Sequence, residues 1–291
     1  MFEPFQYDFF IRGLIAATVA SGLCGFIGVY VVLRKMSYIG HGLSHAVFGG
    51  AVVSFVMDFN FYIGSTVWGF GSALLIILMT RVRKFIAADA AIGIITTSSF
   101  ALGVALISHY HKFTRNFDAA LFGNILGVDN TDLAAIIAVT AVTLGLVVLL
   151  YRRLLFTTFD PEVAPFFGVD TNWMDAIFAL ILASAIVVSL RVLGATLIAA
   201  TLVIPPITAR LLTDHFGRMM GLSVLIGALS GFFGIYISYY VDIASGASIV
   251  LLSAGLFTAA LVYSSLRQRL TSMRRIAPTP SAAQTQHALF D

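Results

Sequence analysis

The sequence predicts an all-α polytopic membrane protein with about eight or nine transmembrane helices. Three observations lead to this class: 59% of the 291 residues are hydrophobic, only 11% are charged, and long apolar runs recur along the whole chain. A typical soluble domain has about 25% charged residues. A run of about 20 apolar residues is long enough to cross the hydrocarbon core of a bilayer as a helix.

Nine apolar segments follow one another, separated by short stretches in which the charged residues gather. They cover residues 10–33, 40–57, 61–80, 90–110, 132–150, 173–190, 193–212, 219–241 and 247–266. The segment at 40–57 is short for a full span, so eight spans are the alternative to nine.

Between the fourth and fifth segments lies an apolar run that is too short to cross a membrane, FDAALFGNILGV at 117–128. We expect a short re-entrant or interfacial helix there, buried against protein, because a lipid-exposed half-span would leave its backbone polar groups unpaired. The segments form a single transmembrane domain over residues 1–267. The polar remainder, 268–291, is predicted to be a disordered cytoplasmic tail.

The distribution of Lys and Arg predicts the orientation in the membrane. With the N-terminus outside and the C-terminus inside, all but four of the 17 Lys and Arg residues face the cytoplasm; the four are Arg12, Lys112, Arg115 and Arg191. Positive charge accumulates on the cytoplasmic side of membrane proteins. The outer face is then net acidic, which favours approaching cations or reflects only the same positive-inside bias.

Two of the chain's six histidines, His41 and His45, are the ionisable residues placed well inside a predicted span. Residues four apart share one helix face, with Cβ atoms about 5–6 Å apart. Two neutral imidazoles can bind one borderline metal ion such as Zn²⁺, Mn²⁺ or Fe²⁺, and Ser37 and Ser44 can add weak oxygen ligands or hydrogen bonds. Two nitrogens do not fill a coordination sphere, so other segments or another subunit must contribute. The alternative is that both histidines only fix helix packing.

The chain has no G-x-x-x-x-G-K-[ST] phosphate loop, so ATP is expected to act only through a partner chain. Two loops on the predicted inner side, 154–173 and 202–219, retain apolar residues, which indicates a docked protein. Pro205 and Pro206 are expected to break their helix. The freed carbonyls then line a gate or cavity, the alternative being a plain kink.

Five stretches of the chain carry a family resemblance. They are VLRKMSYIGHGLSHAVFGG (32–50), LFGNILGV (121–128), FDPEVAPFFGVD (159–170), LRVLGATLIAATLVIPPITARLL (190–212) and SYYVDIASGASIVLL (238–252). In these stretches, and in their order, the chain resembles the membrane permease subunits of metal-ion ABC importers, the manganese, zinc and iron group known as the ABC-3 type.

The resemblance implies the type II ABC importer permease fold and a multi-pass location in the cytoplasmic membrane, inner or plasma. The chain would be a transport subunit, not an enzyme. It would import a divalent transition metal ion (Mn²⁺, Zn²⁺ or Fe²⁺), driven by ATP hydrolysis in a separate subunit. The implied assembly is a homodimer of permeases, two cytoplasmic ATP-binding subunits and an extracytoplasmic metal-binding protein. No permanent cofactor and no nucleic acid is expected.

The resemblance also implies a metal-binding role for the position of each histidine. Family members usually read Gly-Asp-x-Leu-Ser-His-Ala over the stretch matching residues 40–46, and the Asp and His are thought to bind the metal in transit. His45 matches that histidine, whereas His41 stands where the aspartate usually is. Losing a hard, charged oxygen ligand should favour Zn²⁺ or Fe²⁺ over Mn²⁺. The site should also be more acid-sensitive, because an imidazole must be neutral to bind metal.

By analogy with the fold, two loops are candidates for docking the ATPase. The first is represented by Thr208, Arg210, Leu211, Thr213, Asp214 and His215. The second contains Asp160 and Glu162. On the predicted outer side, Asp118 and Asp242 are candidates for guiding ions along the metal path or for contacting the metal-binding protein.

Two other functions remain open at this point. The chain could be a stand-alone secondary transporter that exchanges metal for protons through His41 and His45. The shortage of carboxylates inside the spans argues against this, since proton relays often use Asp or Glu. It could also be a membrane scaffold with no transport activity.

Overall fold

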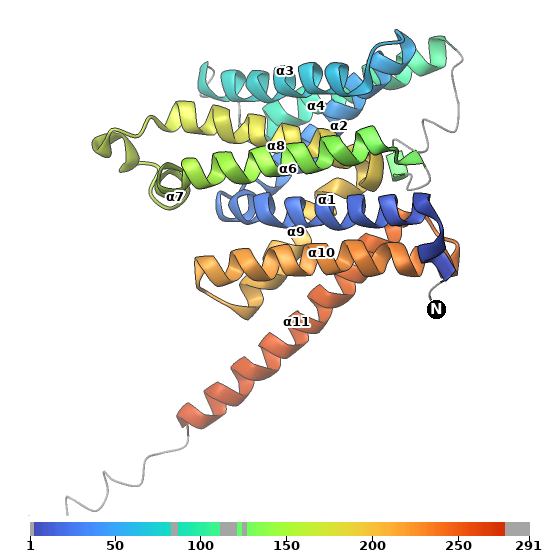
Figure 1. Ribbon diagram of the computed structural model, residues 1–291. Coiled ribbons are helices and arrows are strands. Elements are labelled where there is room, and N and C mark those ends of the chain that lie inside the picture. Colours follow the sequence, from blue (N-terminus) through green and yellow to red (C-terminus); the bar gives the residue numbers. More distant parts are fainter. Residues whose placement is uncertain (1–2, 83–86, 111–120, 124–126, 277–291) are drawn as a thin grey trace, which may run out of the picture.

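The computed structural model describes residues 3–82, 87–110, 121–123 and 127–276. In these ranges the regular elements are helices, and most of their long axes run side by side in one bundle (Figure 1). The helices are α1 (Asp8–Leu33), α2 (Ser37–Val56), α3 (Phe61–Val82), α4 (Ala88–His109), α6 (Asn130–Leu149), α7 (Tyr151–Phe159), α8 (Thr171–Leu193), α9 (Ala195–Leu212), α10 (Phe216–Val241) and α11 (Ser245–Ile276), with short 3₁₀ helices η1 (Glu3–Gln6) and η3 (Ala164–Phe167).

Among the described residues, nine helices are long and apolar enough to cross a membrane. They coincide with the nine predicted segments, so the all-α prediction is confirmed and the alternative of eight spans is not needed. The short segment at 40–57 belongs to a 20-residue helix, because α2 already begins at Ser37. Arg191, which falls between two of the predicted segments, lies in the last turn of α8, and the connection to α9 is Gly194 with a φ of 77°.

Two sequence predictions concern residues at or beyond the edges of the described ranges. The predicted re-entrant helix at 117–128 is described only in part, because residues 117–120 and 124–126 lie outside these ranges. The described residue Leu121 is held by the Thr196 hydroxyl, which donates to its carbonyl oxygen at 2.7 Å. At the other end of the chain, α11 continues to Ile276, so the predicted domain boundary at residue 267 falls inside a helix.

The bundle has two ends, which we name after α1. The Asp8 end is the side on which α1 begins and α10 ends, and the Leu33 end is the side on which α1 ends and α2, α8 and α10 begin (Figure 1). Most residues of α1, α2 and α8 are buried, whereas few of α11 are. α11 leaves the bundle obliquely toward the Leu33 end. The core of the chain is therefore built around α1, α2 and α8.

The predicted break at Pro205 and Pro206 is wrong. Both prolines are buried inside α9, which runs without interruption from Ala195 to Leu212. Pro206 has no N–H to donate to the carbonyl four residues earlier, that of Leu202. Gly28 of α1 packs directly against that carbonyl oxygen and the Pro206 ring. Because Gly28 has no side chain, α1 packs closely enough to bury the unpaired Leu202 carbonyl. α9 therefore continues past the prolines. A gate at these prolines stays a prediction.

Candidate metal-binding site

The two histidines lie together on α2, near the Leu33 end of the bundle. Their ring centroids are 4.8 Å apart and the rings are almost perpendicular, at 87°. His41 is exposed and His45 is half-buried. The α-helical spacing therefore brings both imidazoles to one place, as the sequence predicts, with the outer ring open to a ligand or to another chain.

The surroundings of His45 leave one nitrogen without a partner. Its Nδ1 is buried and makes no hydrogen bond within the described residues. The ring edge packs at 5.2 Å against Phe100 of α4, and the Tyr38 ring lies 6.4 Å from that of His41. An unsatisfied buried acceptor or donor is costly and calls for an explanation, and a metal ion bound during transport supplies one.

Small residues of α2 allow α4 to approach the histidine helix. A Cβ on Gly42 would lie 2.5 Å from Ile92 Cγ2, and one on Gly49 would collide with the Ser99 carbonyl oxygen. This close packing positions Phe100, which contacts both His45 and Phe48. Within the described part of the chain, no group of three or more His, Cys, Asp or Glu side chains is arranged to hold a metal. The pair thus supplies two nitrogens and no more.

The two serines of the predicted site are placed differently. Ser44 is buried, and its hydroxyl donates to the His41 carbonyl oxygen at 2.7 Å. Its proton is used within the helix, which leaves only lone pairs for any other partner. Ser37 is half-buried at the first residue of α2, one turn before His41.

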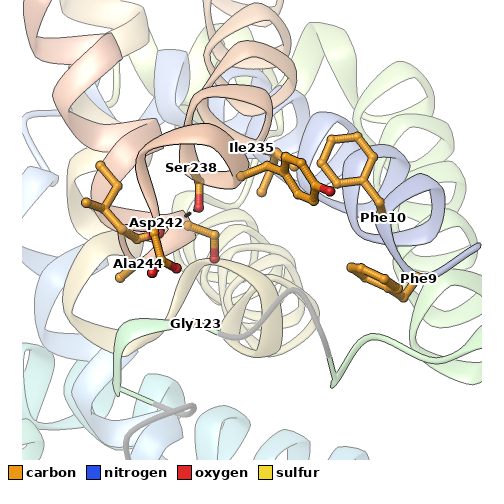
Figure 2. Close-up of a pocket in the computed structure, with 10 residues that line it drawn as sticks. Phe9, Phe10, Gly123, Ile235, Ser238, Asp242 and Ala244 are labelled. Atoms are coloured by element: carbon orange, nitrogen blue, oxygen red, sulfur yellow. Dashed lines mark hydrogen bonds between the residues drawn. The ribbon is translucent and has the colours of Figure 1, made fainter. Parts of the chain in front are cut away.

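The carboxylates of the predicted metal path are not near the histidines. Asp118 lies outside the described residues. Asp242 is exposed just after α10, at the Asp8 end, where its φ of 56° turns the chain toward α11. It lines a cavity of about 350 Å³ together with aromatic side chains that include Phe9, Phe10 and Tyr239 (Figure 2). The structure therefore separates Asp242 from His41 and His45 by the length of the bundle.

The predicted docking residues surround the Leu33 end. Arg210, Asp214 and His215 are exposed, Leu211 and Thr213 are half-buried, and Thr208 is buried with its hydroxyl bonded to the Ile204 carbonyl. Asp160 and Glu162 are exposed beside η3.

The two docking loops meet at one aromatic side chain. The Phe216 ring lies 6.0 Å from Phe159 and 6.3 Å from Tyr151, so the start of α10 packs on α7. Next to them, Phe166 and Phe167 of η3 are 88% and 69% exposed. The sequence pointed to this loop through its apolar residues but did not single out these two phenylalanines, although an adjacent aromatic pair in a polar loop is a usable signal.

Sequence reasoning also missed a buried arginine at the Leu33 end. Arg34 is paired with Asp175 of α8 at 3.0 Å, and only 5% of its side-chain surface is exposed. Burial lowers the pKa of the guanidinium, and the Asp175 carboxylate opposes that shift. Arginine stays charged in proteins, so a buried cation is maintained here. In the sequence Arg34 was only one of many basic loop residues.

A second ionic cluster lies at the Asp8 end. Asp132 of α6 is fully buried and pairs with Arg191 of α8, while the Tyr62 hydroxyl of α3 donates to the same carboxylate at 2.6 Å. In the sequence, Arg191 was only one of four basic residues on the predicted outer side, and Asp132 was not singled out. Only the packing of three helices shows that they meet.

The family model described as the ABC 3 transport family matches residues 6–264. The chain belongs to this family. The resemblance seen in the five sequence stretches is thereby confirmed, and the chain is a multi-pass membrane protein of the ABC transporter permease class.

Relatives and a solved structure agree with this assignment. The chain is 38% identical over 252 residues to the manganese import system permease protein ScaB of Streptococcus parasanguinis, covering 87% of this chain and 89% of that protein. It is 31% identical over 266 residues to the chelated iron transport system membrane protein YfeC of Yersinia pestis, covering 90% and 89%. The structure of PsaBC from Streptococcus pneumoniae in complex with Fab matches with a TM-score of 0.80 and 34% identity, covering 88% of this chain and 91% of that chain.

Proposed function

We propose that this chain is the permease subunit of an ABC importer for a divalent transition metal ion, Mn²⁺, Fe²⁺ or Zn²⁺, and that His41 and His45 bind the ion during transport. The observation that carries the proposal is the paired imidazoles on α2, with the unpartnered Nδ1 of His45, in a chain of this family. Neutral imidazole is a good ligand for each of these metals.

The working assembly is two copies of the permease, two cytoplasmic ATP-binding subunits and an extracytoplasmic metal-binding protein. The exposed ring of His41 supports the pairing of two copies, because a pair of nitrogens needs further ligands and an open face admits another chain. The N-terminus is outside and the C-terminus is cytoplasmic, which the Lys and Arg distribution supports. The Leu33 end then faces the cytoplasm.

The ATPase docks at the Leu33 end on the two loops that meet at Phe216. The exposed rings of Phe166 and Phe167 support this, since aromatic side chains in a polar setting are typical of the centre of a protein interface. The exposed residues Asp160 and Glu162, and the turn at Thr213 to His215, lie at its rim. On the opposite side, the cavity that contains Asp242 attracts cations or contacts the metal-binding protein.

Uptake of ⁵⁴Mn²⁺ into proteoliposomes that contain the permease, its ATPase and the metal-binding protein tests this function. We expect uptake that requires ATP and is abolished by His45→Ala, while the complex still assembles. His109→Ala, which removes an exposed histidine at the end of α4, is the matched control and should leave uptake unchanged. Full uptake by His45→Ala would exclude the ligand role. Uptake by the permease alone, driven by a proton gradient, would favour the secondary transporter instead.

A further inference from the structure

The side chain of Arg34 joins three helices at the Leu33 end. Its Nε donates to the Thr158 hydroxyl at 3.0 Å, Nη1 to the Asp175 carboxylate at 3.0 Å and Nη2 to the Thr157 hydroxyl at 2.6 Å. The guanidinium also lies 4.6 Å from the centre of the Phe178 ring. All three nitrogens of the guanidinium are therefore used, in a fork whose geometry is rigid.

The two threonines are oriented to accept these bonds. Both belong to α7, and each hydroxyl donates its proton to a backbone carbonyl of the same helix, with Leu154 accepting from both. A hydroxyl whose proton is committed presents only lone pairs to its surroundings. Since Thr157 and Thr158 are buried, their lone pairs face the arginine and not water.

On its other side Arg34 is continuous with the helix that carries the histidines. It is the C-cap of α1, and α2 begins after only two more residues, Lys35 and Met36. The connection is fixed by two backbone bonds, Lys35 N–H to Val32 O at 3.0 Å and Met36 N–H to Val31 O at 2.8 Å. With Lys35 at a φ of 57°, this is a Schellman motif. This turn fixes the start of α2 relative to the end of α1, which carries Arg34.

The helix that Arg34 holds leads directly to the exposed phenylalanines. The Phe156 ring of α7 lies 5.3 Å from the Phe167 ring of η3. α7 has only nine residues, too few to be a stable helix by itself, so its position depends on its contacts. Side-chain contacts therefore run from η3 through α7 to Arg34, and the backbone turn after Arg34 leads into α2, which carries His41 and His45.

We propose that Arg34 is a positioning residue that couples movement of the docking loop at 154–173 to the histidine pair on α2. The proposal rests on the proposed function, because it presumes an ATPase at that loop. Only the arginine of this pair is buried, since the Asp175 side chain is 45% exposed. A buried charge contributes little to stability compared with apolar packing, and a directional link between moving elements gives this arginine a role. Asp175 and Phe178 of α8 are the fixed side of the link, and Thr157 and Thr158 are the moving side.

The test is the number of metal ions imported per ATP hydrolysed by the full complex in proteoliposomes. For Arg34→Gln we expect an assembled complex that hydrolyses ATP at close to the wild-type rate, with uptake reduced at least about tenfold, as for loss of a charge-assisted hydrogen bond. Thr157→Val with Thr158→Val keeps the side-chain shape, removes two acceptors and should also lower the ratio. If the Arg34→Gln complex fails to assemble, this double variant provides the test instead.

Arg267→Gln, which changes an exposed arginine on α11, is the matched control and should leave the ratio unchanged. A purely structural role for Arg34 would lower assembly, hydrolysis and uptake together, so an unchanged ratio in the assembled variants would overturn the inference. If the wild-type complex shows no ATP-driven uptake, it is the proposed function that fails and not the coupling role.

Discussion

Position 41 holds the exposed imidazole of the pair, and its ring packs at 4.8 Å against that of His45. The family resemblance implies an aspartate here. Under the proposed function, the imidazole therefore changes the charge and hardness of one of two ligands on the same face of α2. Because no third His, Cys, Asp or Glu joins them in the described ranges, we expect these two side chains to provide most of the metal selectivity that this chain contributes under the proposed function.

We expect the metal preference to depend on whether position 41 holds an imidazole or a carboxylate. His41→Asp restores a hard oxygen ligand and should shift uptake toward Mn²⁺ relative to Zn²⁺, because carboxylates suit Mn²⁺ and imidazole suits Zn²⁺. The measurement is competition between ⁵⁴Mn²⁺ and ⁶⁵Zn²⁺ for uptake by the reconstituted complex, with His41→Asn as the uncharged control. An identical preference in wild type and His41→Asp would show that position 41 does not select the metal.

The buried carboxylate of Asp132, at the start of a membrane span, is stabilised by several partners. Its carboxylate accepts from the Tyr62 hydroxyl and the Asp129 backbone N–H, and it pairs with Arg191. Each of its oxygens therefore has a partner, as burial of an ionised group demands. The buried Asp132 carboxylate would be left short of a partner if Arg191 or Tyr62 were removed, so this cluster ties α3, α6 and α8 together at the Asp8 end.

At the scale of helices, the contact between α1 and α9 depends on complementary backbone features. α9 has a carbonyl without its helical donor, at Leu202, and α1 presents Gly28 to it. A carbonyl in this position is protected from lipid and water by close packing, and a Cα–H group of the glycine can make a weak contact to it. The proline and the glycine are thus parts of the same contact.

A glycine-to-alanine substitution, which adds one methyl group, should have a different effect at Gly28 than at a helical glycine with open space around it. In Gly28→Ala the new Cβ would collide with the Leu202 carbonyl, and it would lie 3.0 Å from Pro206 Cγ, whereas a Cβ at Gly145 of α6 would meet no atom within 4 Å. We expect Gly28→Ala to lower the melting temperature of the purified permease. Gly145→Ala should not, since alanine favours a helix over glycine by about 0.5–1 kcal/mol. Equal melting temperatures for the two variants would contradict this account.

For the molecule as a whole, the two ends of the bundle differ in chemistry. The Leu33 end has Arg34, the exposed Phe166 and Phe167 and the turn at His215, and the Asp8 end has the cavity with Asp242. This asymmetry supports docking of an ATPase at one end and arrival of the metal at the other. It requires the Leu33 end to be cytoplasmic.

Cysteine labelling checks that orientation, because the chain's single cysteine, Cys24, is buried. A cysteine introduced at the exposed Tyr7 should react with a membrane-impermeant maleimide added to intact cells. One introduced at the exposed Glu162 should react only after the membrane is opened. The opposite pattern would reverse the topology, and labelling of both after permeabilisation is the control for accessibility.

The sequence by itself determined the class, the places of the apolar helices (with eight spans as an alternative to nine), the family and the histidine pair. Each of these depends on local features: hydrophobic runs, motifs and the i, i+4 spacing of one helix. It predicted a break at Pro205 and Pro206 that does not occur, since the compensation comes from Gly28, far away in the chain. Tertiary structure alone decided that Arg34 meets Thr157, Thr158 and Asp175, and that Asp132 meets Arg191. These contacts join residues 59 to 141 positions apart, and only the packing of helices brings such residues together.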